Sequence, residues 1–220
     1  MIELLRETEL FSGLAEPLLR SIADECVTNA YPSGTILFRE NEVGTLLYFV
    51  VSGSIKIFTT NANGESKILS IITRGDCFGE LSLLDGKPRS ATAQVIEDTK
   101  LISLSAKSFN QLLKNNHEIT LGIIKQLSAR LRETNQQVQD LTYLNSKQRV
   151  MKNLLQLAGT HGRRNAKTIH VRLSLNYDEL SQMAGVTKPL LFQVFHELQE
   201  KQILSFVEKE FILDLSRLKV

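Results

Sequence analysis

The regular spacing of glycines in the first half of the chain constrains its fold more than any other sequence feature. Between Gly34 and Gly86, glycines recur about every ten residues and separate short runs rich in β-branched and aromatic residues, which is typical of short antiparallel strands joined by tight turns. Asn63 and Gly64 give the strongest hairpin signal. The spacing therefore predicts an antiparallel β-roll over about residues 28–105. The runs expected as strands are 35–38, 46–51, 54–60, 67–72, 91–96 and 100–105.

Helical patterns flank this β-roll. An opening helix is expected over about residues 8–25, with a break at Gly13, and a second helical stretch over residues 106–144. Apolar residues in the second stretch recur three and four positions apart, which indicates either a helix packed on its own β-roll or a parallel two-helix dimer interface. The seam is narrow and has the polar Thr134 in its middle, so the dimer interface is favoured. The seam residues are Ile124, Leu127, Leu131, Thr134, Val138 and Leu141.

The sequence pattern changes at Asn145. Asn145 and Ser146 end the seam and can cap a new helix that runs to about Gly159, so a hinge is expected here. The basic segment 159–167 is expected as a loop, and residues 168–173 alternate as a strand. We therefore expect an α+β protein. Its expected parts are a β-roll domain (1–116), a helix with the hinge (117–145) and a C-terminal domain (146–220).

Composition and motifs exclude several classes of protein. A net charge of +2 and a pI near 8.5 neither demand nor exclude a nucleic-acid partner. The start of the chain lacks a basic secretory signal, and the longest apolar run is far below the ~18 residues of a membrane span, so a soluble cytoplasmic protein without a membrane partner is expected. Cys26 and Cys77 have no CxxC partner and are expected to be inert buried thiols. Since catalytic and metal-ligand motifs are also missing, neither an enzyme nor a metal site is expected.

The segment 77–93 carries the residues expected to bind an anion. Gly79 lets a ligand approach the backbone, and Arg89, after a proline-stiffened turn, offers a planar fork for two phosphate oxygens, with the Ser90 hydroxyl beside it. Glu80 would repel a phosphate unless it accepts a hydrogen bond from a sugar hydroxyl or pairs with Arg89. A ligand with a phosphate and a free hydroxyl satisfies all these groups. The alternative is a buried ion pair between Glu80 and Arg89 without a ligand, and chemistry alone leaves both open.

The run FGELSLLDGKPRSATA, residues 78–93, resembles the phosphate-binding cassette of cyclic-nucleotide-binding domains. These domains occur in the catabolite activator protein (cyclic AMP receptor protein/fumarate-nitrate regulator) family and in the regulatory subunits of cyclic-AMP-dependent kinase. The resemblance implies that Glu80 takes the ribose 2′-hydroxyl and that Arg89 holds the cyclic phosphate. The other cassette residues that it implies in ligand binding are Gly79, Leu81, Ser82, Ser90 and Ala91.

The resemblance continues into residues 130–144, which look like the dimerisation helix of the family. There a threonine and the following residue reach the adenine, the second from the partner subunit, and these positions match Thr134 and Asn135. Asn135 departs from the serine usual in the catabolite activator protein, so the base remains open. Cyclic AMP is the first expectation for the effector, and cyclic GMP and a cyclic dinucleotide are the alternatives.

Residues 176–198 resemble the family's helix-turn-helix, and residues 205–207 and 211–213 would form its wing. Lys188 and Gln193 can reach a guanine and an adenine, whereas Leu190 and Phe192, expected to be exposed, suit thymine methyl groups or a protein contact. Phosphate contacts can come from Arg163, Arg164 and Lys201 as well. The residues expected to contact DNA are Asn176, Tyr177, Thr187, Lys188, Pro189, Leu190, Phe192 and Gln193.

Together these features predict a homodimeric transcription regulator. The helix of residues 117–145 would join the two copies, and bound cyclic nucleotide would shift the hinge near Asn145 and so the spacing of two recognition helices. Double-stranded DNA and RNA polymerase are its expected partners. One alternative is a cyclic-nucleotide-dependent protein-interaction module whose winged helix does not read DNA. The other is a gas or redox sensor that uses Cys77, although the chain lacks the ligand pattern of such a sensor.

Overall fold

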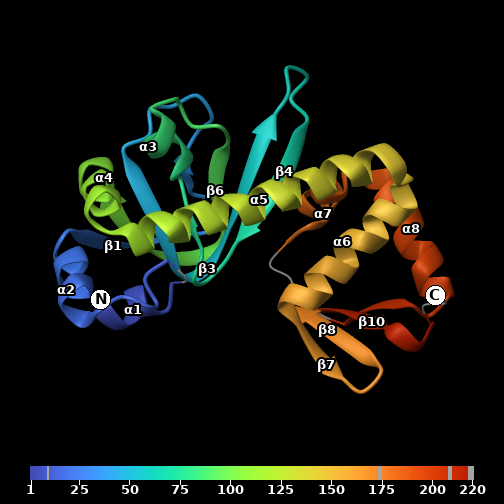
Figure 1. Cartoon of the computed structure of the whole chain (residues 1–220). Coiled ribbons are helices and arrows are strands. Elements are labelled where there is room, and N and C mark those ends of the chain that lie inside the picture. Colours follow the sequence, from blue (N-terminus) through green and yellow to red (C-terminus); the bar gives the residue numbers. More distant parts are fainter. Residues whose placement is uncertain (9, 173–174, 208–209, 218–220) are drawn as a thin grey trace. The chain divides into compact units, whose positions relative to one another are not determined.

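The computed structural model describes residues 1–8, 10–172, 175–207 and 210–217. The chain divides into two compact units, Met1–Glu133 and Thr134–Val220. Antiparallel sheets and helices are both present in each unit, so the α+β class expected from the sequence is confirmed (Figure 1).

The first unit contains the expected β-roll. Its strands form a six-stranded antiparallel sheet in the order β1-β6-β3-β4, with β2 beside β6 and β5 beside β3. Phe49 of β3 and Ile102 of β6 are buried in one apolar cluster, and Ile55 and Leu101 are buried in another, because successive residues of a strand point to opposite faces. The strands are β1 (Cys26–Tyr31), β2 (Ile36–Phe38), β3 (Leu46–Thr60), β4 (Ser66–Ile72), β5 (Cys77–Phe78) and β6 (Thr92–Ser105).

Two pairs of expected strands are each one long strand. Gly53 does not end a strand but lies inside β3, with φ +88 and a shift in pairing register on either side. A β-carbon there would lie 2.7 Å from the Thr99 Cα, so glycine marks a bulge and not a turn. Likewise, β6 runs through 97–99 without a break. The hairpin turn at Asn63 and Gly64 between β3 and β4 is confirmed.

The helices of the first unit differ from the expected ones at two places. The opening helix is instead a pair, α1 (Ile2–Arg6) and α2 (Glu16–Asp24), because Thr8 caps the end of α1 by donating from Oγ1 to the Leu5 carbonyl at 2.7 Å. Asn116, with an extended backbone (φ −135, ψ 100), separates α4 (Ala106–Asn115) from α5 (His117–Tyr143). The short α3 (Leu81–Asp85) follows β5.

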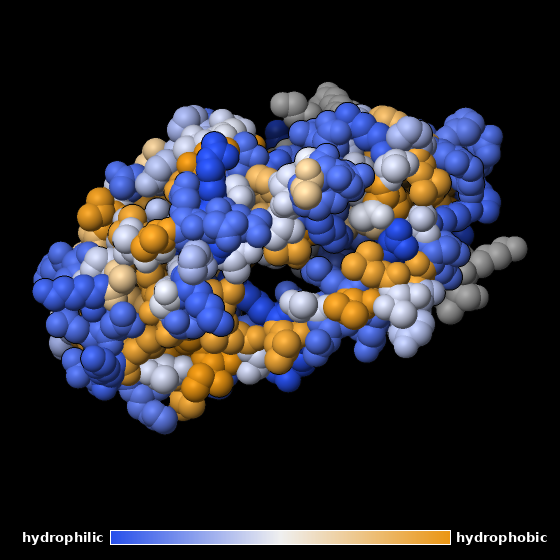
Figure 2. Space-filling model, turned by 90° about the horizontal axis from the view of Figure 1, so that it is seen from above, coloured by the Kyte–Doolittle hydropathy of each residue, from blue (hydrophilic) through white to orange (hydrophobic). Residues whose placement is uncertain are grey.

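Helix α5 packs on the β-roll through Ile119, Ile123 and one residue of the predicted seam, Leu127. Ile119 and Ile123 are buried against the roll, whereas Leu131 and Val138 of the seam are 62% and 57% exposed. The interpretation in which the seam packs on its own β-roll therefore holds for Leu127 but not for Ile124 and Leu131, which are exposed. Figure 2 shows that exposed hydrophobic residues, in orange, lie among the hydrophilic residues, in blue, on this face of the molecule.

The second unit packs helices on a four-stranded sheet in the order β7-β8-β10-β9. The basic segment expected as a loop forms β7, which pairs with β8 around a turn in which Ala166 has φ +49. The wing hairpin, β9 with β10, is confirmed, while Leu173 of the expected strand lies outside the described residues. The elements are α6 (Ser146–His161), β7 (Gly162–Asn165), β8 (Thr168–Arg172), α7 (Tyr177–Ala184), α8 (Lys188–Glu200), β9 (Leu204–Val207), β10 (Glu210–Asp214) and a 3-10 turn (Leu215–Arg217).

None of the helices in the described part of the chain is both long and apolar enough to cross a bilayer.

Candidate functional site

The turn after β5 depends on glycine. Gly79 has φ +85, a backbone angle that residues with side chains rarely adopt. A β-carbon there would lie 2.7 Å from the Arg89 Nη1 and 3.2 Å from the Leu46 carbonyl oxygen. Gly44 plays a similar part across the site, because a β-carbon on it would collide with the Ser82 hydroxyl. Both glycines thus make room for the guanidinium of Arg89.

Arg89 is buried, and its guanidinium donates to two carbonyl oxygens and a hydroxyl. Its Nη1 donates to the Gly79 carbonyl at 2.5 Å and to the Ser82 Oγ at 3.0 Å, and its Nη2 donates to the Leu46 carbonyl at 2.7 Å. The Cζ atom lies 4.1 Å from the centre of the Phe38 ring. Arg89 is only 5% exposed, and its Nε has no hydrogen-bond partner. Burial lowers the pKa of the guanidinium, so an anion at Nε would relieve an unfavourable buried charge.

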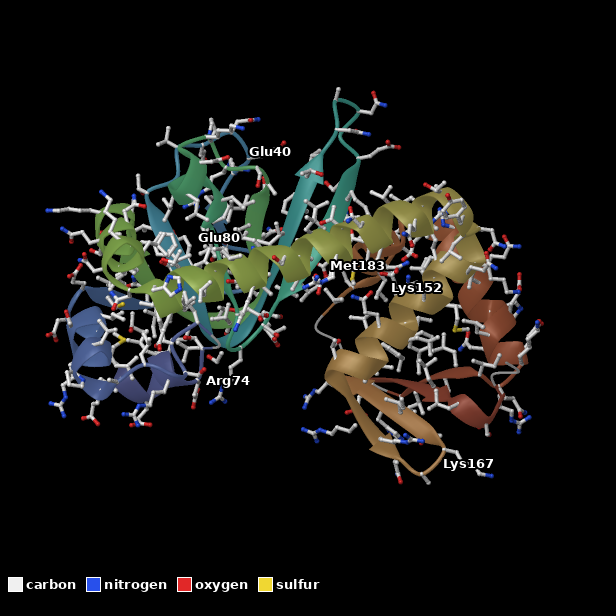
Figure 3. All side chains as sticks on the ribbon, viewed as in Figure 1. Glu40, Arg74, Glu80, Lys152, Lys167 and Met183 are labelled. Atoms are coloured by element: carbon white, nitrogen blue, oxygen red, sulfur yellow. The ribbon has the colours of Figure 1, made fainter. Side chains whose placement is uncertain are left out.

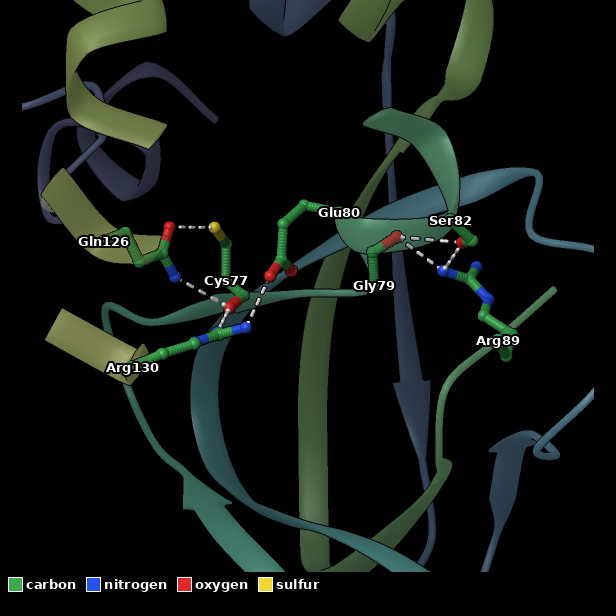
Figure 4. Close-up of polar contacts among 7 residues, drawn as sticks. All are labelled: Cys77, Gly79, Glu80, Ser82, Arg89, Gln126 and Arg130. Carbon is green, nitrogen blue, oxygen red and sulfur yellow. Dashed lines mark hydrogen bonds and ion pairs between the residues drawn. The ribbon is translucent and has the colours of Figure 1, made fainter. Parts of the chain in front are cut away.

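Glu80 pairs with Arg130 of α5 and not with Arg89. Its Oε1 lies 2.6 Å from the Arg130 Nη1, and Arg130 also donates to the Cys77 carbonyl (Figure 4). The sequence alternative of a Glu80–Arg89 ion pair in an empty site is therefore wrong, because carbonyl oxygens hold Arg89 and a second arginine reaches the carboxylate. Glu80 is 1% exposed, and its Oε2 has no hydrogen-bond partner.

Arg130 was not among the ligand-binding residues expected from the sequence. The signal lies on another face of the same helix. Ile119, Ile123, Gln126 and Arg130 follow at steps of four, three and four residues, and the first two are buried. A charged residue that continues a buried stripe needs a buried counter-charge, and Glu80 supplies it (Figure 4).

The seven cassette residues line one cavity of about 60 Å³. This is below the ~300 Å³ at the small end of ordinary ligand pockets. Thr134 and Asn135 are exposed on α5 and belong to the second unit. The residues that line the cavity are Phe38, Ile57, Ser70, Phe78, Gly79, Glu80, Leu81, Ser82, Arg89, Ser90, Ala91 and Arg130.

Cys77 lies directly beside this cassette but is held in a neutral pair. Its thiol donates to the Gln126 Oε1 at 3.1 Å, and Gln126 donates back to the Cys77 carbonyl at 3.1 Å. Burial raises the pKa of the Cys77 thiol to about 12, and burial likewise raises that of Cys26 to about 12. Because thiols with such raised pKa values stay protonated at neutral pH, both cysteines are poor nucleophiles. Among the described residues, no group of three or more potential metal ligands gathers.

The helix-turn-helix starts and turns as its sequence predicts. Asn176 and Glu179 form a capping box, with hydrogen bonds of 3.0 Å and 2.9 Å between side chains and backbone amides. Gly185 ends α7 with φ +60, in the left-handed region, and Thr187 precedes α8 with an extended backbone. Thr187 is the N-cap residue by position, although its side chain makes no capping hydrogen bond.

The outward face of α8 combines polar and aromatic residues. Phe192 is 46% exposed and packs on Tyr177, with ring centres 5.0 Å apart, whereas Leu190 is half-buried, so the expected exposure holds for Phe192 only. Lys188 pairs with Asp178 at 2.5 Å. Asn176, Thr187, Pro189 and Gln193 are exposed, as are Arg163, Arg164 and Lys201. This face thus presents amide and ammonium groups beside an aromatic surface.

Known proteins share both the domains and the fold of this chain. Residues 28–116 match the family model of the cyclic nucleotide-binding domain, and residues 148–220 match that of the Crp-like helix-turn-helix domain. The "CRP-like cAMP-activated global transcriptional regulator" of Mycobacterium tuberculosis is 30% identical over 188 residues, which cover 86% of this chain and 84% of that protein. The "Cyclic AMP receptor protein" of Thermus thermophilus is 28% identical over 199 residues, which cover 90% and 89%.

A solved structure agrees in fold. The c-di-GMP responsive regulator CLP of Xanthomonas campestris has a TM-score of 0.78 to this structure at 23% identity, covering 89% of this chain and 97% of that one. The two domains occur here in one chain, and both curated relatives match most of its length. The relative from M. tuberculosis is named as a transcriptional regulator. This chain therefore belongs to the cyclic AMP receptor protein/fumarate-nitrate regulator family of transcription regulators, with a cyclic nucleotide-binding domain and a helix-turn-helix.

Proposed function

We propose that this regulator is a homodimer that binds cyclic AMP in the β-roll cavity and thereby controls the binding of α8 to DNA. One observation carries the ligand part of the proposal. A donor, Arg89 Nε, and an acceptor, Glu80 Oε2, are both buried without a hydrogen-bond partner in residues that line the same cavity. Buried polar atoms are nearly always paired, so this combination favours a ligand with an anionic group and a hydroxyl.

Cyclic AMP supplies both groups. In the proposed complex, Arg89 binds the cyclic phosphate, Ser82, Ser90 and the backbone of Gly79 and Ala91 surround it, and Glu80 accepts from the ribose 2′-hydroxyl. Leu81 closes the edge of the cavity. Cyclic AMP is preferred over cyclic GMP and a cyclic dinucleotide because the relatives from M. tuberculosis and T. thermophilus carry cyclic AMP in their names. Thr134 and Asn135 are proposed to contact the base, Asn135 from the partner subunit.

The proposed dimer forms through the α5 seam. Large apolar side chains that protrude from a helix at heptad spacing are unfavourable in water and are covered by a partner helix in coiled coils. In the domain assignment that we propose, residues 1–116 bind the ligand, 117–145 dimerise and 146–220 bind DNA. The exposed apolar residues of the seam are Ile124, Leu131, Val138 and Leu141.

The proposed DNA surface is the outward side of α8 and its surroundings. Lys188 and Gln193 would read base edges and Phe192 would touch thymine methyl groups, with Pro189 and Leu190 beside them. Asn176, Tyr177 and Thr187 would contact the backbone. RNA polymerase is a further proposed partner, because the relatives of this chain regulate transcription.

A protein-interaction module is the second candidate. The exposed aromatic pair of Tyr177 and Phe192 favours it, because aromatic residues are enriched in the centres of protein interfaces. Selection from random duplex DNA, with and without cyclic AMP, separates the two candidates. The proposal expects ligand-dependent enrichment of a palindrome, and a library that stays random under both conditions would favour the interaction module.

A further inference from the structure

Three helices meet at one side chain, Arg149, in the first turn of α6. Its Nη1 donates to the carbonyl of Leu144, directly after α5, at 2.9 Å. Its Nε donates to the carbonyl of Ala184, the last residue of α7, at 3.0 Å, and its Nη2 donates to the carbonyl of Gly185 at 3.0 Å. The guanidinium thus uses all three of its nitrogens to connect the end of α5 with the turn of the helix-turn-helix.

The chemistry of these acceptors explains why an arginine stands here. The last carbonyl groups of a helix have no partner within the helix and carry partial negative charge, so a cation nearby is favourable. Arg149 serves two such helix ends at once, because its planar fork presents donors in fixed directions. A lysine ammonium is a single point and cannot span the two ends in the same way.

Other contacts cross the same corner. Lys152 of α6 (Figure 3) lies 2.6 Å from the Asp140 carboxylate of α5. Burial acts to raise the pKa of Asp140, but hydrogen bonds from Lys152 and Gln136 outweigh it and lower that pKa. Lys147, at the start of α6, pairs with Glu197 of α8. These ion pairs connect α6 with both α5 and α8. All of these residues lie inside one compact unit, Thr134–Val220.

We propose that Arg149 is a positioning residue that fixes the angle between the end of α5 and the helix-turn-helix. The corner at Leu144 and Asn145 is then a rigid joint and not the flexible hinge that the sequence suggests. Helix α8 begins at Lys188, only three residues after Gly185, so the residue that holds Gly185 also sets the start of the recognition helix. If the joint is rigid, a rotation of the last turn of α5 rotates α8 by the same angle.

Distance measurement within the second unit tests this rigidity directly. Spin labels are attached through Gln139→Cys on α5 and Gln199→Cys on α8, both at exposed positions, in a Cys26→Ser, Cys77→Ala background. Labelled chains are mixed with an excess of unlabelled chain, so that each labelled particle holds one pair, and pulsed electron paramagnetic resonance gives the distance distribution. We expect a narrow distribution for Arg149 and one at least about twofold broader for Arg149→Gln, since local motion grows when few contacts restrain a segment.

A matched variant and a conservative one complete the test. Arg172→Gln removes the same charge from an exposed position on β8 and should leave the distribution narrow. Arg149→Lys keeps the charge but loses the fork, so it should broaden the distribution while the circular dichroism stays helical. A narrow distribution in Arg149→Gln overturns the proposal. Loss of helical signal in both Arg149 variants also overturns it, because the residue would then maintain the fold and not the angle.

The consequence for regulation rests on the proposed function. Arg149→Lys should bind cyclic AMP with the affinity of the wild type, yet cyclic AMP should change its DNA affinity at least about threefold less, because a loose joint lowers the coupling between two sites. A protein that binds no DNA at all would contradict the proposed function and leave the distance result valid. A protein that keeps full coupling in Arg149→Lys would contradict the role of the joint alone.

Discussion

The β-roll cavity and the outward face of α8 differ in whether their polar groups already have partners within the chain. In the cavity, Arg89 and Glu80 are almost fully buried, and each retains an atom without a hydrogen-bond partner. On α8, Lys188 is exposed and already paired with Asp178, and Phe192 leans on the Tyr177 ring. Buried unpaired groups carry a large energetic penalty and so specify the chemistry of a ligand, whereas an exposed ion pair contributes little.

This difference teaches how far each region defines its partner. The cavity presents one buried N–H donor, the Nε of Arg89, and one buried carboxylate oxygen, the Oε2 of Glu80, and so favours a ligand with an anionic group and a hydroxyl. The α8 face could suit DNA bases, phosphates or another protein. Its polar groups are exposed to water, so leaving them without a binding partner has little cost in free energy. Experiments on the cavity should therefore give large effects, and experiments on α8 small ones.

The largest expected effect concerns the thiol next to the cavity. Burial raises the pKa of Cys77 from 9.0 to about 12. Near pH 8, a thiol with this pKa holds roughly a thousandfold less thiolate than a thiol with the ordinary pKa, and thiolate is the reactive form. In a Cys26→Ser background, alkylation of the native protein should be at least about a thousandfold slower than in urea, and it should speed up as the pH rises. Rapid labelling of the folded protein at pH 8 would show that this part of the roll is open.

Loss of Arg89 should be the most damaging change for the ligand. Arg89→Leu removes the proposed phosphate contact from a buried site, where loss of a charged partner costs about 2–5 kcal/mol, so the affinity for cyclic AMP should fall at least about thirtyfold. Titration calorimetry measures it. Arg39→Leu, at an exposed position of the same roll, is the matched control and should bind as the wild type does. Equal affinity in the two variants would contradict the site.

Glu80 should show a smaller effect that depends on the sugar. Glu80→Gln weakens the proposed bond to the 2′-hydroxyl, which at about 1.5–3 kcal/mol corresponds to an affinity loss of roughly 10- to 150-fold for cyclic AMP. The 2′-deoxy analogue should bind the wild type weakly and should lose little further in Glu80→Gln, because the two changes remove the same contact. Additive losses would mean that Glu80 acts only by holding Arg130. Glu25→Gln serves as the exposed control.

The smallest effect is expected at Phe192. Replacing thymine by uracil in a selected operator removes one methyl group, which at about 0.8 kcal/mol per buried carbon should weaken binding about fourfold at each contacted position. In Phe192→Ala the same replacement should make no difference. Gel-shift titrations with paired thymine and uracil duplexes measure both. A wild type that is indifferent to the methyl groups would assign Phe192 to protein contact instead.

Local sequence signals predicted much of the fold. The turn at Gly64, the helix caps at Asn145 and Asn176 and the turn at Gly185 follow from residues within a few positions of one another. The bulge at Gly53 was taken for a turn, because a glycine with positive φ suits both, and only the Thr99 backbone across the sheet distinguishes them.

Long-range contacts set the limit for the site. The turn conformation of Gly79 and its closeness to Arg89 follow from a short segment, so the cassette could be recognised from its residues alone. The pairing of Glu80 with Arg130 joins positions fifty residues apart, and nothing near Glu80 in the sequence points to it. Leu190 is half-buried beside the exposed Phe192 because of the way α8 is rotated about its axis against its neighbours. Hydrophobic periodicity does not fix this rotation closely enough to tell which of two nearby residues is exposed.

The most direct test of the central claim follows the side chain of Arg89 itself. The Nε–H signal of Arg89, assigned in a ¹H–¹⁵N spectrum with the Arg89→Lys variant, reports the buried donor without a partner. Titration with cyclic AMP should shift this signal downfield and saturate at one ligand per chain, because a phosphate oxygen then accepts its proton. A signal that stays in place while cyclic AMP binds, or throughout a titration in which nothing binds, would contradict the account.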